Sequence, residues 1–229
     1  DLVETLRQLA KLAESSDAAD LRKEAKSLAE RAEDDALAEA IIREMIAADD
    51  ADAWAFAELT KKREKAGDFK EVYSLLVRRA ELAADGESIK ELRHDAAAVA
   101  RDKLDDKQSA VDLLEQIFEE HPTDERAPKA LRELYSSMGR KKDLLKLLER
   151  LIDVAEGKDQ RSSLRIEAAN VCEELGTTSE AIDHLRAALD DEPTHKDATL
   201  MLSRLLEKTG RDEELAELLS SQIELAAQR

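Results

Sequence analysis

The side chains that could do catalytic or metal-binding chemistry are few and scattered in this sequence. The one cysteine, Cys172, sits in an apolar run where a buried structural thiol is the expected role. Glu91 and His94 form one Glu-x-x-His spacing, but di-iron helical proteins use two such motifs and two further glutamates. No metalloprotease, dinucleotide-binding or phosphate-loop motif is present. We therefore expect no catalytic residue, no metal site and no cofactor, and a protein that is not an enzyme.

The charge balance excludes several classes of partner. The chain has 229 residues, with 36 lysines and arginines against 54 acidic residues, which gives a formal charge of −18. Nucleic acids and anionic membranes repel such a chain, so neither is expected as its main partner. No apolar stretch approaches the roughly 20 residues that a spanning helix needs, so direct membrane insertion is not expected. The first four residues show no signal-peptide pattern, and the expected compartment is the cytoplasm.

The elements that must position any functional side chain are helices. Alanine, leucine, glutamate, lysine and arginine dominate, and all are strong helix formers. Apolar residues recur with the spacing of one helical face, and no window alternates with period two over more than a few residues. Residues 141–156 show this pattern with Leu144, Leu145, Leu147, Leu148, Leu151, Ile152 and Ala155.

Glycines and prolines repeat at a fixed distance. Gly67 and Gly139 are 72 residues apart, Gly139 and Gly210 are 71 apart, and Pro122 and Pro193 are 71 apart. A fixed period in this range indicates stacked helix pairs. We expect one array over residues 1–229, with a lone helix at 1–14 and pairs at 18–50, 51–86, 87–123, 124–158, 159–194 and 195–229. Apolar terminal helices predict a segment of a longer chain that is able to self-associate through its ends.

Residues 159–194 resemble a tetratricopeptide repeat, a family with about 34 residues per repeat and small residues where its two helices cross. The matching positions are Ala169, Gly176, Ala181, Leu185, Ala188 and Pro193. In residues 87–123, Asp105 replaces the turn glycine, and residues 18–50 match by helical pattern alone, so related helix-pair solenoids remain open for the first third. The predicted fold is all-α, a right-handed α-solenoid of about six antiparallel helix pairs plus one leading helix.

The resemblance implies where a partner would bind. In this family the first helix of each pair lines a concave groove that receives an extended peptide or a helix. Asn170, the only asparagine of the chain, could bond a peptide backbone, and the basic positions could meet an acidic segment or a C-terminal carboxylate. The transferred groove positions with polar or charged side chains are Arg126, Lys129, Glu133, Asn170, Glu173, Arg204 and Lys208.

Two basic clusters stand out from the acidic background. Residues 126–150 carry eight basic and three acidic side chains, and residues 61–65 carry four basic ones. Both are also explained as ordinary solvated helix surface. The preferred function is a non-catalytic scaffold or adaptor for protein partners. The alternatives are a regulatory or targeting domain of a larger enzyme or membrane-associated complex and, least favoured, a helical hydrolase or metal enzyme.

Overall fold

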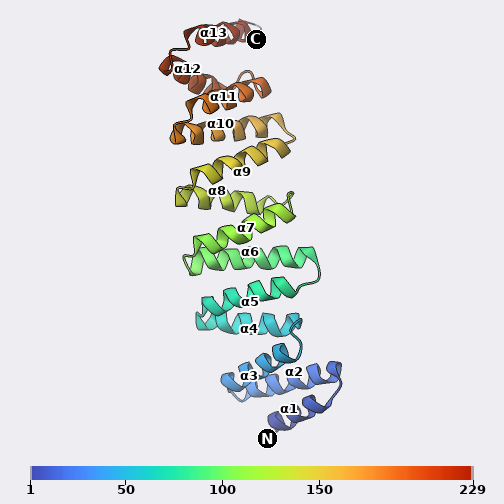
Figure 1. Cartoon of the computed structure of the whole chain (residues 1–229). Coiled ribbons are helices and arrows are strands. Elements are labelled where there is room, and N and C mark those ends of the chain that lie inside the picture. Colours follow the sequence, from blue (N-terminus) through green and yellow to red (C-terminus); the bar gives the residue numbers. More distant parts are fainter. Residues whose placement is uncertain (1, 228–229) are drawn as a thin grey trace. The chain divides into compact units, whose positions relative to one another are not determined.

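The computed structural model describes residues 2–227 and divides into two compact units between Ala127 and Pro128. Every regular element in the described residues is an α-helix, which confirms the predicted all-α class (Figure 1). The helices are α1 (Leu2–Leu12), α2 (Ser15–Arg31), α3 (Asp35–Ala48), α4 (Ala53–Ala66), α5 (Phe69–Leu82), α6 (Gly86–Lys103), α7 (Lys107–Glu120), α8 (Arg126–Met138), α9 (Lys141–Val154), α10 (Lys158–Leu175), α11 (Thr178–Asp191), α12 (Lys196–Lys208) and α13 (Asp212–Ala227).

In the first unit each helix packs against the helix that precedes it and the one that follows it in the chain, from α1 to α7. The connections are a few residues long, so neighbouring helices run antiparallel. The apolar faces of α3 and α4 meet in one cluster that includes Ile42, Met45, Phe56 and Leu59, all nearly inaccessible to solvent. The unit is therefore a stack of helices whose core passes from each helix to the next.

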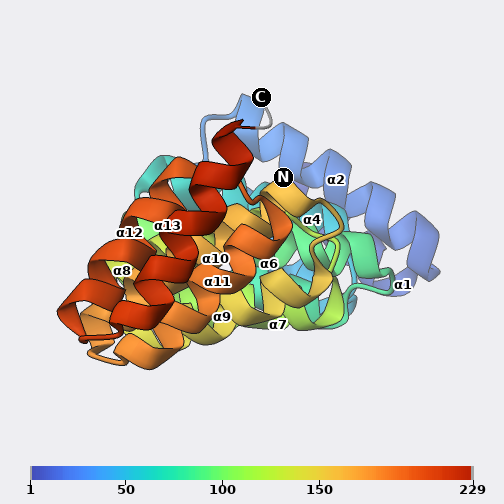
Figure 2. The ribbon, with the colours of Figure 1, turned by 90° about the horizontal axis from the view of Figure 1, so that it is seen from above.

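The second unit repeats this order from α9 to α13, and Figure 2 shows its last three helices side by side. Its core joins α10, α11 and α12 through side chains such as Cys172, Leu185 and Leu205, which are fully buried. The last helix differs because none of its side chains is buried, and its Leu219 and Ile223 are exposed.

A residue in the left-handed conformation stands at the turn inside every helix pair. Four of these residues are glycines, and the remaining two are Glu33, with φ of 59°, and Asp105, with φ of 53°. The left-handed residue lets the next N–H bond back to the closing turn of the helix, as Asp68 does to the carbonyl of Arg63. Asp105 thus takes the conformation of the glycine that it replaces.

The other two glycines lie at the starts of helices. Gly86 is the first residue of α6, and Gly157 is the N-cap of α10 in extended conformation. Aspartates cap the starts of two first helices. Asp124 Oδ1 accepts from the Ala127 N–H at 2.7 Å before α8, and Asp85 Oδ1 accepts from the Ser88 N–H at 2.8 Å at the start of α6. Aspartate competes well for this role because its short carboxylate reaches the free N–H groups.

The observed helices fall in pairs close to the expected ranges. Helix α2 begins at Ser15, ahead of the expected start at residue 18, and α6 and α10 each begin one residue early, at Gly86 and Lys158. The expected leading helix is α1. The grouping of all residues into one array with six repeat boundaries stays a prediction.

Candidate functional site

The predicted groove residues lie on first helices of pairs in both units. Arg126 belongs to the first unit, and the other six belong to the second. All are exposed except Glu173, which is half-buried. They occupy α8 (Arg126, Lys129, Glu133), α10 (Asn170, Glu173) and α12 (Arg204, Lys208).

Two of the predicted residues meet in the second unit. The guanidinium of Arg204 on α12 donates to Glu173 Oε2 on α10 at 2.5 Å. Asn170 lies about one turn before Glu173, and Leu200, with 69% of its surface exposed, lies one turn before Arg204. The adjoining faces of α10 and α12 therefore present an amide, an apolar side chain and a partly neutralised cation.

A second ion pair joins α8 to α10. Arg132 Nε lies 3.1 Å from Glu167 Oε1. On the same helix, Lys129 and Glu133 are exposed and one turn apart. In the part of the chain that the structure describes, neither Lys129 nor Lys208 has a carboxylate oxygen within ion-pair distance. The second unit thus offers two cations that are open to an external anion.

Arg126 is paired within the first unit. Its Nη1 donates to both carboxylate oxygens of Glu91 on α6, at 2.7 and 2.8 Å. This hydrogen bond lowers the pKa of the Glu91 carboxyl and raises the pKa of Arg126. Glu91 was not predicted from the sequence as the partner of Arg126. The two residues are 35 positions apart, which is about one repeat, so opposite charges at that separation could have indicated an ion pair between successive first helices.

Much of the basic cluster at 126–150 is also compensated. Lys141 pairs with Glu174 at 3.0 Å, and Arg140 pairs with Asp143 at 2.8 Å. Lys146, on α9, is exposed. The cluster is therefore a mixed surface more than a continuous basic stripe, as the solvated-surface interpretation predicts.

The residues with catalytic chemistry belong to different units, Cys172 to the second and His94 to the first. Cys172 is buried, and burial raises the pKa of its thiol. His94 is also buried, and its Nε2 lies 3.2 Å from Asp124 Oδ2, whereas Glu91 turns to Arg126. Within residues 2–227, no group of three or more histidine, cysteine or acidic side chains is placed to hold a metal ion. No described helix has the length and apolar character that crossing a membrane requires.

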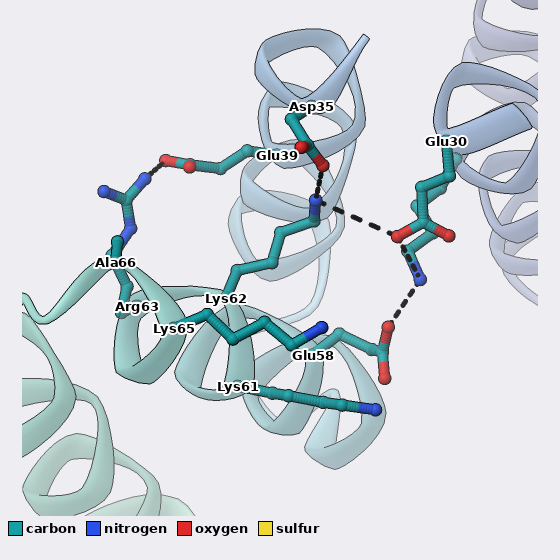
Figure 3. A pocket seen from close by; sticks show the side chains of 10 residues that line it. Glu30, Asp35, Glu39, Glu58, Lys61, Lys62, Arg63, Lys65 and Ala66 are labelled. Carbon is teal, nitrogen blue, oxygen red and sulfur yellow. Dashed lines mark hydrogen bonds and ion pairs between the residues drawn. The ribbon is translucent and has the colours of Figure 1, made fainter. Parts of the chain in front are cut away.

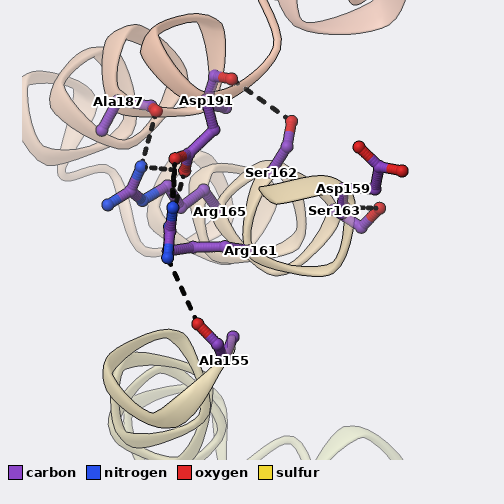
Figure 4. Close-up of polar contacts among 9 residues, drawn as sticks. Ala155, Asp159, Arg161, Ser162, Ser163, Arg165, Ala187 and Asp191 are labelled. Carbon is purple, nitrogen blue, oxygen red and sulfur yellow. Dashed lines mark hydrogen bonds and ion pairs between the residues drawn. The ribbon is translucent and has the colours of Figure 1, made fainter. Parts of the chain in front are cut away.

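A cluster of two arginines and one aspartate holds α10 against α11 (Figure 4). Arg161 donates to Asp191 through Nε at 3.0 Å and through Nη2 at 2.7 Å, and Arg165 also donates to Asp191. A further Arg161 nitrogen donates to the Ala155 carbonyl at 3.2 Å. These contacts fix the helix that carries Asn170 and Glu173.

Comparison with known proteins finds one family model that matches part of the chain. The tetratricopeptide repeat family model matches residues 174–229, and this confirms the predicted resemblance in that segment. No curated protein matches the chain.

Several solved structures are similar to the chain. One is YrrB, described as a TPR protein with an unusual peptide-binding site: identity is 17%, TM-score 0.45, and the match covers 80% of this chain and 91% of that one. The second is the Podosopora anserina putative kinesin light chain with TPR-like repeats. It shows 21% identity and a TM-score of 0.44, and the match covers 76% of this chain and 94% of that one. The third is MamA from Desulfovibrio magneticus RS-1. It shows 15% identity and a TM-score of 0.42, and the match covers 76% of this chain and 94% of that one.

Proposed function

We propose that this protein is a non-catalytic scaffold or adaptor that binds a partner peptide or helix. In the second unit, the binding surface consists of the exposed faces of α8, α10 and α12. The observation that carries the proposal is the contact between Glu173 and Arg204, because it shows that predicted groove positions from successive first helices adjoin. Stacked helix pairs present extended surfaces of this kind to their partners.

The side chains on this surface suit an acidic segment or a C-terminal carboxylate. Lys129 and Lys208 supply charge, and Asn170 can both donate to and accept from a peptide backbone. Leu200 offers an apolar contact, since most of its surface is exposed. The partner is a protein, and the surface has no feature that selects nucleic acid.

A displayed library of random peptides tests the proposal. Peptides that bind the whole chain are selected, and their affinities are then measured against a variant with Lys129→Glu and Lys208→Glu. We expect losses of about tenfold, because reversed charges repel an acidic ligand. The matched control carries Lys142→Glu and Lys146→Glu on α9, where both side chains are exposed. Selected peptides that bind both variants as well as the original chain would contradict the proposed surface.

A further inference from the structure

The second basic cluster, at residues 61–65, borders a hollow in the first unit. Helices α2, α3 and α4 line a hollow of about 580 Å³, and its lining residues lie near the C-terminal ends of α2 and α4 and the N-terminal end of α3 (Figure 3). Its lining is almost entirely charged, with five basic and four acidic side chains: Lys26, Glu30, Asp35, Glu39, Glu58, Lys61, Lys62, Arg63 and Lys65, together with Ala66.

Each carboxylate of the hollow is held by a cation of the same unit. Lys26 Nζ lies 3.0 Å from Glu30 and 2.5 Å from Glu58. Lys62 Nζ lies 2.6 Å from Asp35, and Arg63 pairs with Glu39.

Two of these pairs favour the ionised form of their carboxylate. The hydrogen bond from Lys62 lowers the pKa of Asp35, and the hydrogen bond from Lys26 lowers the pKa of Glu58. Three cations, Lys26, Lys62 and Arg63, hold the four carboxylates, so these ion pairs by themselves leave one negative charge uncompensated.

Lys61 and Lys65 supply the excess charge. Both are exposed, and among the described residues neither has a carboxylate oxygen within the 4.0 Å of an ion pair. Figure 3 shows their side chains extending from α4 beside Glu58. The lining of the hollow thus carries five basic and four acidic side chains, a net charge of +1, with Lys61 and Lys65 outside its ion pairs, on a chain whose formal charge is −18.

The same face of α4 carries the aromatic side chain of Trp54. Trp54, Glu58, Lys61 and Lys65 are spaced four, three and four residues apart, so they share one helical stripe. Trp54 is 36% exposed, and the ammonium of Lys26 lies 5.5 Å from its ring centroid. The Lys26 ammonium therefore lies over the Trp54 ring and at the same time forms the ion pair with Glu58.

We propose that this stripe of α4 binds an acidic peptide segment that also carries an apolar side chain. Lys61 and Lys65 would meet the acidic groups, and Trp54 would meet the apolar one. At 1.5 Å per residue, these lysines stand about 10 and 16 Å along the helix from Trp54, a distance that three to five extended peptide residues span. The site lies in a different unit from the surface proposed above and is independent of it.

The intrinsic fluorescence of Trp54 reports binding directly because it is the only tryptophan. The probe is the capped peptide Leu-Ser-Ser-Glu-Ser-Glu, and a second peptide has glutamine in place of both glutamates. We expect a saturable fluorescence change with the first peptide and at least about tenfold weaker binding of the second.

The variant with Lys61→Glu and Lys65→Glu is expected to lose at least about tenfold in affinity for the acidic peptide. The control variant with Lys142→Glu and Lys146→Glu should stay within about twofold, and thermal unfolding checks that both variants fold. An unchanged spectrum, equal binding of the glutamine peptide or full affinity of the first variant would overturn the inference. Lys129→Glu with Lys208→Glu should leave this binding intact, so the two surfaces succeed or fail separately.

Discussion

Glu33 and Asp105 hold backbone conformations that glycine adopts without cost. A left-handed conformation brings Cβ close to the following carbonyl oxygen, at a cost of about 1–2 kcal/mol. The equivalent turns at Gly67, Gly139 and Gly176 also have positive φ values, but glycine has no Cβ and so avoids that cost. The geometry of the turn is therefore common to all pairs, although the residue type is not.

Replacing Glu33 by glycine should stabilise the first unit. The strain of about 1–2 kcal/mol is removed, while the added freedom of glycine in the unfolded chain offsets about 0.5–1 kcal/mol of it. We expect a net gain of about 0.5–1 kcal/mol in the free energy of unfolding, measured by urea denaturation.

The reverse change supplies the control. In Gly67→Ala the new Cβ would meet nothing within 4 Å, so only the backbone strain acts and a loss of about 1 kcal/mol is expected. A glycine at position 33 that leaves stability unchanged or lowers it would show that the turn there is not strained.

Asp191 should make the stability of the second unit depend on pH. The hydrogen bond from Arg161 holds the pKa of Asp191 below its ordinary value of 3.8. A carboxyl with a lowered folded pKa contributes stability above the unfolded value and loses it as the pH falls through the folded value. Asp191→Asn should therefore cost on the order of 2 kcal/mol at pH 7, and this difference should shrink below pH 3.8.

Chemical denaturation of both proteins between pH 2 and pH 7 measures this difference. The neighbouring Asp190 is exposed, so Asp190→Asn should have little effect across the same range. A difference for Asp191→Asn that persists unchanged at the lowest pH would exclude the ionised carboxylate as its cause.

At the scale of the elements, small residues set how closely α10 and α11 approach. Ala169 on α10 and Ala181 and Ala188 on α11 are inaccessible to solvent, as the repeat pattern predicted. A larger side chain at such a crossing forces neighbouring side chains or the backbone to move.

Ala169→Leu should destabilise the second unit by about 1–3 kcal/mol, because the extra atoms have no space between the helices. Ser163→Leu, at an exposed position of the same helix, is the matched control and should change stability by less than about 0.5 kcal/mol. Thermal and urea unfolding of both variants test the comparison. Equal losses in the two would mean that the crossing tolerates larger residues.

The helices and their turns could be predicted because their causes are local or periodic. Gly176 marks a turn by its own conformational freedom, and Asp105 was recognised by its place in the repeat. Glu33 was missed because glutamate carries no signal for a left-handed turn. The contact of Arg126 with Glu91 was also missed, since ion pairs depend on which rotamers meet across two helices. The hollow beside Lys61 required the three-dimensional packing of α2, α3 and α4.

At the scale of the whole molecule, helix packing within each unit runs mainly between helices that are neighbours in the chain, and exposed ion pairs such as Arg204 with Glu173 link every second helix. A substitution that destabilises the core of one unit should therefore have little effect on the stability of helices farther along the chain. Leu185→Ala, at a fully buried position of the second unit, should cost about 2–5 kcal/mol there. We expect faster amide exchange in α10–α12 and unchanged exchange in α2–α4, measured by hydrogen–deuterium exchange with mass spectrometry.

Leu219→Ala serves as the control because its side chain is 47% exposed, and it should leave exchange in both regions nearly unchanged. Exchange that accelerates equally throughout the chain after Leu185→Ala would indicate cooperative unfolding of all helices together.

The Glu173 carboxylate on α10 already pairs with Arg204 on α12, so an acidic ligand has to compete with it for the guanidinium. A ligand that approaches Arg204 must displace Glu173, which then returns to water, so one exposed ion pair is traded for another. Such a trade gains little energy, since exposed pairs contribute only about 0–1 kcal/mol. A basic ligand would make the mirror exchange, in which it pairs with Glu173 in place of Arg204. The internal ion pair therefore limits how tightly a ligand of either charge binds at this position.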